Sequence, residues 1–583
     1  MSAFDRNGRI ISRKFFQFLL PTVLSTVAIS LNEFVDSIIV SHLLGHHAMS
    51  MVGMASPVML LFAVIYMLLG TGGSVVYAEY AGRQRQDKSD SAFSVVFYAS
   101  VLTGALISVT GVIFIDRLSL LLCREDSLIA EFTPYLTVLL ISGFVIIPLQ
   151  VLIIFFPAFG KPHLGTIINI TANGINILMD YVYIRFFDTG LAGASMATLT
   201  GYIMGILIVI VLIISKRISL NFVRTGIKDL YLLYESLKKG VAVALSQFGY
   251  CIKIHFCNHL SVSLLGLRGI MIFTLCMQCV SIVSIAIGGI VAAMVPIASA
   301  LRGQRDFRGI RMLMNKVMTA MALSSVLFFL LFEIWPGIVT AIYNVKSTHM
   351  YEVIAGIRIF SVMFLFRGFV IVFMYYFQIM SRNIYAVLIS MIDGFAGIIP
   401  LALILTRIYG IYGLWMTFPL LAFIMIIVIV TVNHLISALS KGKCSGILVL
   451  PNEDPDVPVY DATAPLDKDK IESVVCSIQE FCNSHLGSEK TSVMVAVTFE
   501  EMLSYTADTR GKNHSTDECD VLLKIFPDEV LLDVRSVGKP HDPSTAPAGD
   551  YSNVDVLRKV ASSIEYNYVM GMNQTRIRLL SGV

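Results

Sequence analysis

The feature that most constrains this chain is a succession of apolar runs, each long enough to cross a lipid bilayer as a helix. About 20 apolar residues span the ~30 Å hydrocarbon layer, where only helices and closed barrels satisfy their backbone hydrogen bonds. We therefore predict an all-α polytopic membrane bundle with twelve spans, at approximately residues 15–41, 48–78, 92–115, 132–156, 163–185, 192–215, 240–265, 270–299, 313–334, 353–379, 384–406 and 412–437.

Composition and loop charge agree with a membrane location. Charged residues make up 14% of the chain and the mean hydropathy is +0.77, whereas soluble domains carry about 25% charged residues. Lys and Arg collect in alternate loops, for example near Arg83, Arg217 and Arg305, and loops rich in these residues stay in the cytoplasm. We predict a multi-pass protein of the cell membrane with both termini in the cytoplasm, lipid around it and no nucleic-acid partner.

Short motifs recur at one constant offset in the apolar part of the chain. Gln84-Arg85 recurs as Gln304-Arg305, and the glycine-bounded turn 190–193 recurs at 410–413. Six spans fit within this offset, so the two copies are parallel and their pseudo-twofold axis runs along the membrane normal. We predict a first lobe at residues 1–220 and a second lobe at 221–443, with binding sites near the bilayer midplane.

Four polar residues of the first lobe form a candidate cation site. Asp36 lies in the first span, Asn176 and Asp180 lie one helical turn apart in the fifth, and Thr198 lies in the sixth. An ionised group at this depth costs about 2.5–3.5 kcal/mol, whereas interhelical hydrogen bonds contribute only about 0.6 kcal/mol and do not need acids. Oxygen ligands suit Na⁺, and closely spaced buried acids also retain a proton. We predict that the coupling ion, H⁺ or Na⁺, binds here.

The acids of this cluster are absent from the second copy of the repeat. At the offset of the repeated motifs, the counterparts of Asp36 and Asp180 are Phe256 and Pro400. Other polar residues occur within the predicted spans, and intramembrane charges mark substrate or ion pathways. The residues that we assign to a candidate substrate cavity are Glu33, Asn173, Lys253, His255, Arg367 and Asp393, of which Asp393 can pair with either Lys253 or Arg367.

The first ~440 residues resemble the MATE family of multidrug and toxin extrusion transporters. The matching pieces are Val35-Asp36 with the following 40–45 segment, the segment 176–180, and the turn 190–193 followed by Thr198. The resemblance implies two six-helix lobes around a central cleft, export coupled to Na⁺ or H⁺ influx, and a cation site at Asp36, Asn176, Asp180 and Thr198. Some members carry acids on the seventh helix, where this chain has Lys253 and His255.

The composition changes after the last span. A proline-rich linker at 444–466 leads into a predicted soluble α/β domain at 467–583, with helices at 468–486 and 491–507 and strands at 521–526, 530–537, 564–570 and 575–580. This domain resembles the GHKL-type ATPase fold of anti-sigma-factor serine kinases. Its nucleotide motif is degenerate, because Tyr505 after Glu501 replaces the Mg²⁺-binding Asn and Ser536 before Gly538 replaces the adenine-reading Asp. We expect no ATP and no other cofactor, and a cytosolic protein partner or a regulatory role instead.

These observations predict a transporter and not an enzyme. The predicted function is a cation-coupled secondary antiporter that exports small cationic or amphipathic compounds by alternating access. One alternative is a lipid-linked oligosaccharide flippase of the same superfamily, which would need a strongly basic cleft. The other is a membrane-anchored signalling protein that acts through its C-terminal domain, for which intact ATP motifs would be expected.

Overall fold

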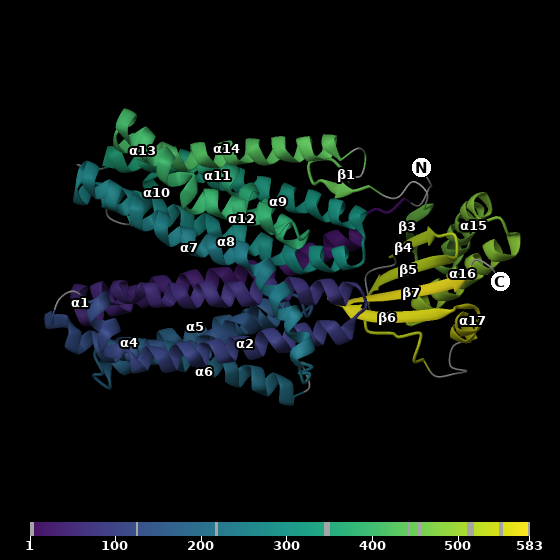
Figure 1. Cartoon of the computed structure of the whole chain (residues 1–583), viewed down its shortest axis with the longest axis horizontal. Helices are drawn as coiled ribbons and strands as arrows, with labels where there is room; N and C mark the ends of the chain where they lie inside the picture. The colour runs from purple at the N-terminus through teal and green to yellow at the C-terminus, as the bar shows by residue number, and fades with distance from the viewer. Residues whose placement is uncertain are drawn as a thin grey trace.

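The computed structural model describes residues 5–123, 126–215, 220–342, 350–440, 442, 444–452, 457–509, 518–546 and 552–580 (Figure 1). The side chain of Glu33, one of the candidate cavity residues, lies outside the described set.

The first lobe consists of helices only. Its elements are α1 (Arg9–Gly82), α2 (Gln86–Ile113), α3 (Ile115–Leu122), α4 (Asp126–Phe155), α5 (Pro162–Arg185) and α6 (Leu191–Ile214). The helix α1 is far longer than one bilayer crossing needs. Both of its ends contact the C-terminal domain, Arg9 through Glu518 and Ala81 through Asn567. The helix therefore reverses direction between its two apolar stretches, Arg9–Leu31 and Met51–Gly82.

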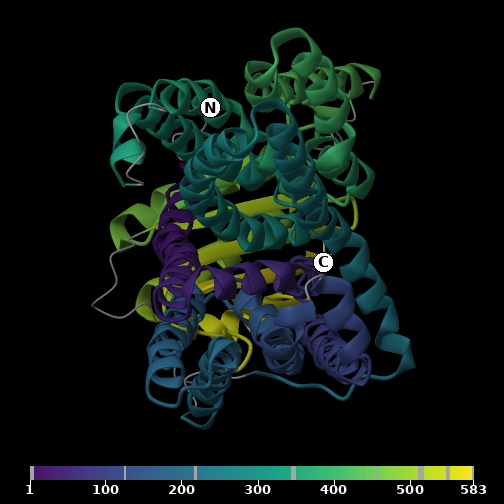
Figure 2. The same cartoon turned by 90° about the vertical axis from the view of Figure 1, so that its left-hand side faces the viewer.

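The second lobe repeats this arrangement. Its elements are η1 (Ile227–Asp229), α7 (Leu230–Leu265), α8 (Leu267–Gly303), α9 (Phe307–Ile334), α10 (Gly337–Ile342), α11 (Met350–Ile379), α12 (Asn383–Met391), the π-helical turn η3 (Ile392–Ala396), α13 (Ile398–Tyr409) and α14 (Ile411–Leu439). Figure 2 shows the two lobes end-on, with the purple and blue helices of the first lobe below the teal and green helices of the second.

The predicted membrane bundle is confirmed. Within the described residues, eleven helical stretches are long and apolar enough to cross a membrane. The helix α5 is not among them, because Asn169, Asn173, Asn176 and Asp180 interrupt its apolar sequence. It is still long enough to span the hydrocarbon, and with α5 the bundle has the twelve predicted spans.

The C-terminal part folds as an antiparallel sheet covered by helices on one face. Its elements are β3 (Val459–Pro465), α15 (Lys468–His485), α16 (Glu489–Thr509), β4 (Glu518–Ile525), β5 (Glu529–Val537), α17 (Ser552–Val560), β6 (Ser563–Val569) and β7 (Met572–Leu580), with strand order β3-β4-β5-β7-β6. Val474 and Phe499 of the helices share a core with Leu523 and Leu532 of the sheet. The two helices and four strands that the sequence predicts are all present.

The predicted linker needs a correction, because residues 459–465 form the edge strand β3. Side chains alternate along this strand. Tyr460, Ala462 and Ala464 join the domain core, while Asp461 and Thr463 lie on the opposite face of the sheet. The flanking prolines suggested a linker, but an edge strand can end at a proline such as Pro465. The preceding segment also has structure, since β1 (Cys444–Ser445) pairs with β2 (Leu450–Pro451).

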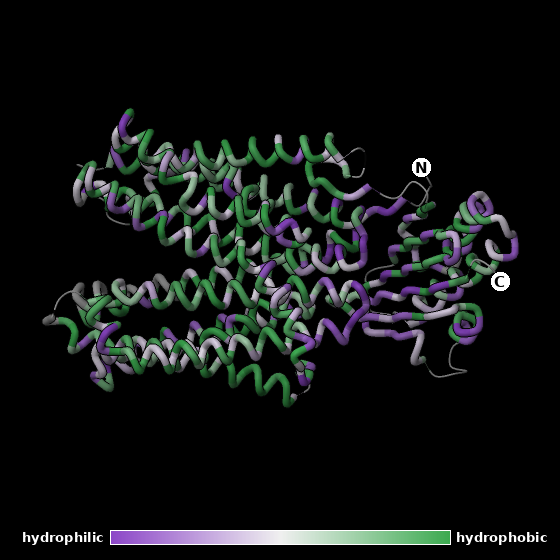
Figure 3. Tube along the Cα trace, viewed as in Figure 1, coloured by the Kyte–Doolittle hydropathy of each residue, from purple (hydrophilic) through white to green (hydrophobic). Residues whose placement is uncertain are grey.

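The C-terminal domain sits at one end of the bundle, where the N-terminus also lies (Figure 1). Apolar residues run along the bundle helices, whereas hydrophilic residues are concentrated in the C-terminal domain and at its junction with the bundle (Figure 3). The helices α15, α16 and α17 lie on the side of the sheet away from the bundle, so the opposite face of the sheet meets the ends of the membrane helices.

Candidate functional site

The structure brings the four predicted cation-site residues together in the first lobe. On α5, Asn176 and the fully buried Asp180 lie one turn apart, and the Asn176 amide donates to the Thr198 hydroxyl of α6 at 3.4 Å. No donor among the described residues reaches either carboxylate oxygen of Asp180. The carboxyl group of Asp36, on α1, lies close enough to Asp180 for the two acids to interact. Two carboxyl groups in such contact need a shared proton or a cation between them.

A tyrosine that the sequence analysis missed belongs to the same site. Tyr135 on α4 is buried and lies near enough to Asp36 and Asp180 to interact electrostatically with both. Glu131, Thr133 and Thr137 lie within four residues of it, and nothing in this mixed sequence distinguishes Tyr135. Only the packing of α4 against α1 reveals its position.

A cavity of about 990 Å³ lies between the two lobes. Pockets for drug-sized ligands typically measure about 300–1,000 Å³ and are mostly apolar. Thr22 and Asn169 line it from the first lobe, and Tyr250, His255 and Asn258 line it from the second. Of the predicted cavity residues, His255 is therefore on the wall. Asn173 is buried in α5 outside this lining, and its amide nitrogen has no hydrogen-bond partner among the described residues.

Three other predicted cavity residues form an ion-pair cluster inside the second lobe, which corrects their assignment. The Asp393 carboxylate lies 3.1 Å from Lys253 Nζ and 3.3 Å from Arg367 Nη1, so it pairs with both. Charges in a medium of low dielectric constant are stabilised by each other more than by an apolar cavity wall. Asp393 belongs to the π-helical turn η3, and π-turns are frequent at functional positions.

Two residues of this cluster correspond in the sequence repeat to polar residues of the first lobe. Lys253 and Asp393 are the second-lobe counterparts of Glu33 and Asn173, at the same offset as the repeated motifs. Close packing of α7 on η3 makes the contact possible, because a Cβ at Gly249 would lie 2.7 Å from the Cα of Gly394. The second lobe therefore carries an internal ion pair at the repeat positions where the sequence of the first lobe has an acid and an amide.

A second interaction missed from the sequence joins the two lobes at the end that faces the C-terminal domain. Glu79 of α1 is buried and forms ion pairs with Lys239 of α7 and, at 2.8 Å, with Arg302 of α8. The backbones cross tightly here, since a Cβ at Gly82 would lie 2.1 Å from the Ala300 carbonyl oxygen. The lobes are therefore in direct contact at this end.

The residues of the predicted degenerate nucleotide motif pack against neighbouring side chains of the C-terminal domain. Tyr505 of α16 is buried, and its ring meets the ring of His541 edge-on at 5.8 Å. The backbone N–H of His541 donates to Asn573 Oδ1 at 3.1 Å, and burial lowers the pKa of its imidazole. Ser536 is buried in β5, and Glu501 is partly exposed with a pKa raised by burial and by Glu500. Tyr505, which the sequence analysis placed in a degenerate nucleotide motif, thus contacts the loop after β5.

Comparison with known proteins gives a consistent assignment of the bundle. Residues 21–182 match the MatE family model. The chain is 24% identical over 212 residues to the multidrug export protein MepA of Staphylococcus haemolyticus, covering 36% of this chain and 47% of that protein. It is 22% identical over 233 residues to MepA of Staphylococcus aureus strain MRSA252, covering 40% and 51%. The chain thus spans about half the length of the curated relatives it matches.

Solved structures extend the likeness to the whole bundle. A structure described as the outward-facing conformation of a multidrug resistance MATE transporter superposes with a TM-score of 0.68 at 20% identity, covering 74% of this chain and 97% of that chain. A MOP-superfamily transporter from Pyrococcus furiosus, described as having a binding pocket of reverse polarity, gives a TM-score of 0.66 at 19% identity, with coverages of 74% and 96%. These likenesses concern the fold. Together with the family match, they confirm the resemblance to MATE transporters.

Proposed function

From this MATE-type bundle, which the sequence relatives and the solved folds have in common, we infer that the chain is a secondary exporter of small cationic or amphipathic compounds. Influx of H⁺ or Na⁺ drives the export. The observation that carries the proposal is the interaction of Asp36 with the buried Asp180, neither oxygen of which meets a donor among the described residues. A proton or a monovalent cation would complete it.

Two helices connect this cation site to the cavity between the lobes. Along α5, Asn169 lines the cavity while Asp180 lies three helical turns further on, a distance of about 16 Å. Along α1, Thr22 and Ile29 line the cavity and Asp36 reaches the cation site. A shift of α1 or α5 on ion binding would therefore change the cavity wall directly, which is the coupling that an antiporter requires.

The energetics suit accumulation of substrate outside the cell. One elementary charge that moves through 100 mV supplies about 2.3 kcal/mol, which corresponds to roughly fifty-fold accumulation. Most of the cavity lining is apolar, with hydroxyl, amide and imidazole groups but no ionised partner among the described lining residues. Such a wall suits apolar cations better than a phosphorylated lipid-linked sugar, which would need basic residues.

The orientation that we propose places the C-terminal domain and the N-terminus in the cytoplasm. Both lie at the same end of the bundle, together with the basic residues Arg83, Arg305 and Arg308. Positively charged loops stay on the cytoplasmic side. The contact between the lobes at Glu79 then closes the cavity toward the cytoplasm.

Ethidium transport in everted membrane vesicles tests the proposal. We expect Asp36→Asn and Asp180→Asn each to lower the initial rate by at least about tenfold, because the amides bind neither a proton nor Na⁺. The matched control is Asp116→Asn, which alters an exposed acid of α3. Separate gradients of pH and of Na⁺ identify the ion. Full transport by Asp180→Asn under both gradients would refute the assignment.

A further inference from the structure

The hairpin between β6 and β7 ends in a two-residue turn of unusual composition. Val569 pairs with Met572, so Met570 and Gly571 form the turn, with φ values of 55° and 73°. Such type I′ turns favour Asn and Gly, because L-residues with side chains are disfavoured at positive φ. The left-handed conformation of Met570 costs about 1 kcal/mol. Since its side chain is buried, the contacts that bury it offset this cost.

Those contacts lie outside the C-terminal domain, against the membrane bundle. Val569, Met570 and Met572 belong to the same apolar cluster as Phe15 of α1 and residues of the second lobe such as Leu301. On the other side, the loop between α4 and α5 touches the turn. A Cβ added at Gly160 would lie 2.4 Å from the Cα of Met570. A Cβ at Gly571 would lie 2.8 Å from the ammonium nitrogen of Lys14. The turn therefore contacts the first lobe and shares a core with the second.

Polar contacts continue from the turn along the sheet to both lobes. Asn567 of β6 donates to the Ala81 carbonyl oxygen at 2.7 Å, next to the tight crossing of α1 and α8. Arg535 of β5 lies 3.1 Å from Asp306 in the loop between α8 and α9, and it also bonds to Gln304. These bonds fix the domain to the end of the first-lobe helix α1 and to the corresponding loop of the second lobe.

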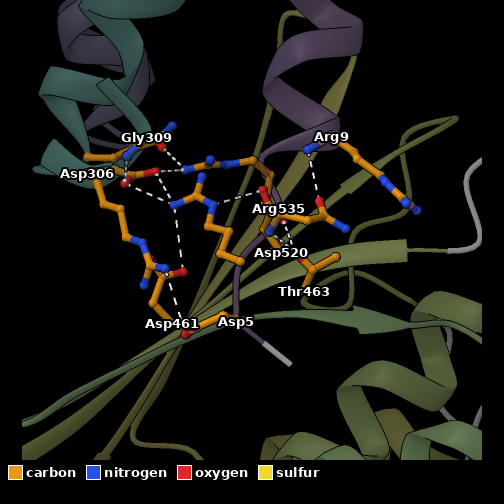
Figure 4. A network of polar contacts seen from close by, with 12 residues as sticks. Asp5, Arg9, Asp306, Gly309, Asp461, Thr463, Asp520 and Arg535 are labelled. Carbon is orange, nitrogen blue, oxygen red and sulfur yellow. Dashed lines mark hydrogen bonds and ion pairs between the residues drawn. The ribbon is translucent and has the colours of Figure 1, made fainter. Parts of the chain in front are cut away.

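An N-terminal arginine completes the attachment. The guanidinium of Arg6 is buried between Asp306 of the bundle, at 2.9 Å, and Asp520 of β4, at 3.1 Å. Figure 4 shows Asp306, Asp461, Asp520 and Arg535 converging on this point, with Arg9 and Thr463 beside it. Within the described residues, the attachment thus combines an apolar turn at one edge of the sheet with a buried ionic cluster at the other.

We propose that the C-terminal domain is an intrinsic brake on the bundle, whose Met570–Gly571 turn and Arg6–Asp306–Asp520–Arg535 cluster hold the two lobes together at the domain end. Alternating access requires the lobes to separate at each end in turn. A body that binds both lobes in their closed arrangement loses these contacts when they separate, so it shifts the population toward the closed state. The domain must withdraw before that end can open. The consequence for export rests on the proposed function, whereas the effect on lobe separation does not.

The test measures the separation of the lobes directly in the full-length protein. Spin labels are attached at Ser215→Cys of the first lobe and Asn315→Cys of the second, both exposed near the domain end, after the exposed Cys251 and Cys476 are changed to Ser. The distance distribution is recorded in detergent without substrate or ion gradient. We expect one dominant short distance in the labelled parent.

The decisive variant is Met570→Gly, which removes the buried side chain while Gly favours the φ > 0 of the turn. The hairpin itself is therefore not weakened, and the domain still folds. We expect the population with a longer distance to rise about tenfold, from a minor state to a readily detected one. Gly160→Ala, which presses on Met570 from the first lobe, should give the same change. Val493→Ser, on the exposed surface of α16, should leave the distribution unchanged.

A distance distribution of Met570→Gly that matches the labelled parent would overturn the proposal. Because no transport is measured, this result is independent of whether the chain exports ethidium. A bundle that opens in Met570→Gly but transports nothing would retain the brake and refute the exporter assignment.

Discussion

Arg6 and Asp306, which are 300 residues apart in the chain, form a buried ion pair of 2.9 Å between the N-terminal segment and the loop before α9. The same carboxylate pairs with Arg535 of the sheet. It also accepts a hydrogen bond from the Gly309 N–H, so Asp306 caps the N-terminus of α9. Burial alone would raise the pKa of Asp306, but Arg6, Arg535 and the Gly309 N–H hold it well below the usual range. One acid thus joins three parts of the molecule.

Asp306→Ala should therefore be strongly destabilising. It leaves Arg6 and Arg535 buried without this partner, and the loss of one member of a buried ion pair costs about 3–5 kcal/mol. We expect a clear fall in the melting temperature of the detergent-solubilised protein. Asp87→Asn, which breaks the exposed pair with Arg85, should have no measurable effect. Equal melting of Asp306→Ala and the parent would contradict the bridging role.

The attachment of the domain should depend on pH through Asp461. Burial raises the pKa of Asp461 to about 6; Arg6 and Arg308 oppose the shift, whereas Asp306 and Asp520 add to it. An undocked aspartate titrates near 3.9. The contribution of Asp461 to docking is therefore complete below about pH 4 and is lost as the pH rises through 6, a change of about 3 kcal/mol.

The contribution of Asp306 to docking changes with pH in the opposite direction, because its pKa is lowered in the docked state. Its contribution is present above its ordinary pKa and is lost as the pH falls below about 4. Docking should thus be strongest near pH 4 and weaken toward pH 6. Melting temperatures between pH 4 and 8 measure this. Asp461→Asn should remove most of the change between pH 4 and 6, and an unaltered slope in that variant would exclude Asp461 as its source.

The ion-pair cluster of the second lobe predicts unequal effects of removing its members. Asp393→Asn leaves the buried Lys253 and the partly buried Arg367 together with no carboxylate, so we expect a loss of about 3–5 kcal/mol. Lys253→Met keeps the Arg367–Asp393 pair and its balanced charge, and should be far milder. Melting temperatures compare the two variants. The double variant should recover part of the loss, and equal effects of the two single variants would contradict this charge balance.

The crossing of α1 and α8 predicts a steric requirement for glycine. Gly82→Ala places a Cβ 2.1 Å from the Ala300 carbonyl oxygen, and such overpacking costs about 1–3 kcal/mol. We expect ethidium transport to fall about tenfold because the closed arrangement at this end is disfavoured. Gly174→Ala, in α5, meets no atom within 4 Å and should leave transport unchanged. Unimpaired transport by Gly82→Ala would show that the lobes need not approach this closely.

The packing of Tyr505 predicts that the C-terminal domain works without ATP. A ligand that binds only the folded state raises its stability by RT ln(1 + [L]/Kd). Millimolar Mg–ATP should therefore leave the melting temperature of the full-length protein unchanged. A rise of several degrees would show that nucleotide displaces the Tyr505–His541 contact.

The parts of the fold that follow from periodicity could be predicted from the sequence. Twelve apolar runs predicted the bundle, and the helical period of α5 placed Asn176 and Asp180 on one face. Tyr135 and Glu79 could not be predicted, because their roles depend on which helices meet at each level of the bundle. Asp393 was correctly expected to have Lys253 or Arg367 as a partner, but the sequence did not show that this cluster lies outside the cavity lining.

The contact between the C-terminal domain and the bundle was not predictable for a related reason. Arg6 stands in a short N-terminal segment with no motif around it, and its partner Asp520 is 514 residues away. Residues 459–465 do alternate between apolar and polar side chains, but Asp461 and Thr463 face the bundle and not solvent. A prediction from local sequence assumes water beyond the sheet, whereas this face meets another folded unit.

The strand order of the sheet also dictates when the brake can assemble. Strand β7 lies between β5 and β6, yet it is translated after both of them. Until the residues of β7 have left the ribosome, β6 has no strand to pair with and the Met570–Gly571 hairpin lacks its second strand. The twelve spans are inserted into the bilayer well before that moment. Every nascent molecule therefore starts as a bundle without this attachment and acquires it only once translation has passed β7.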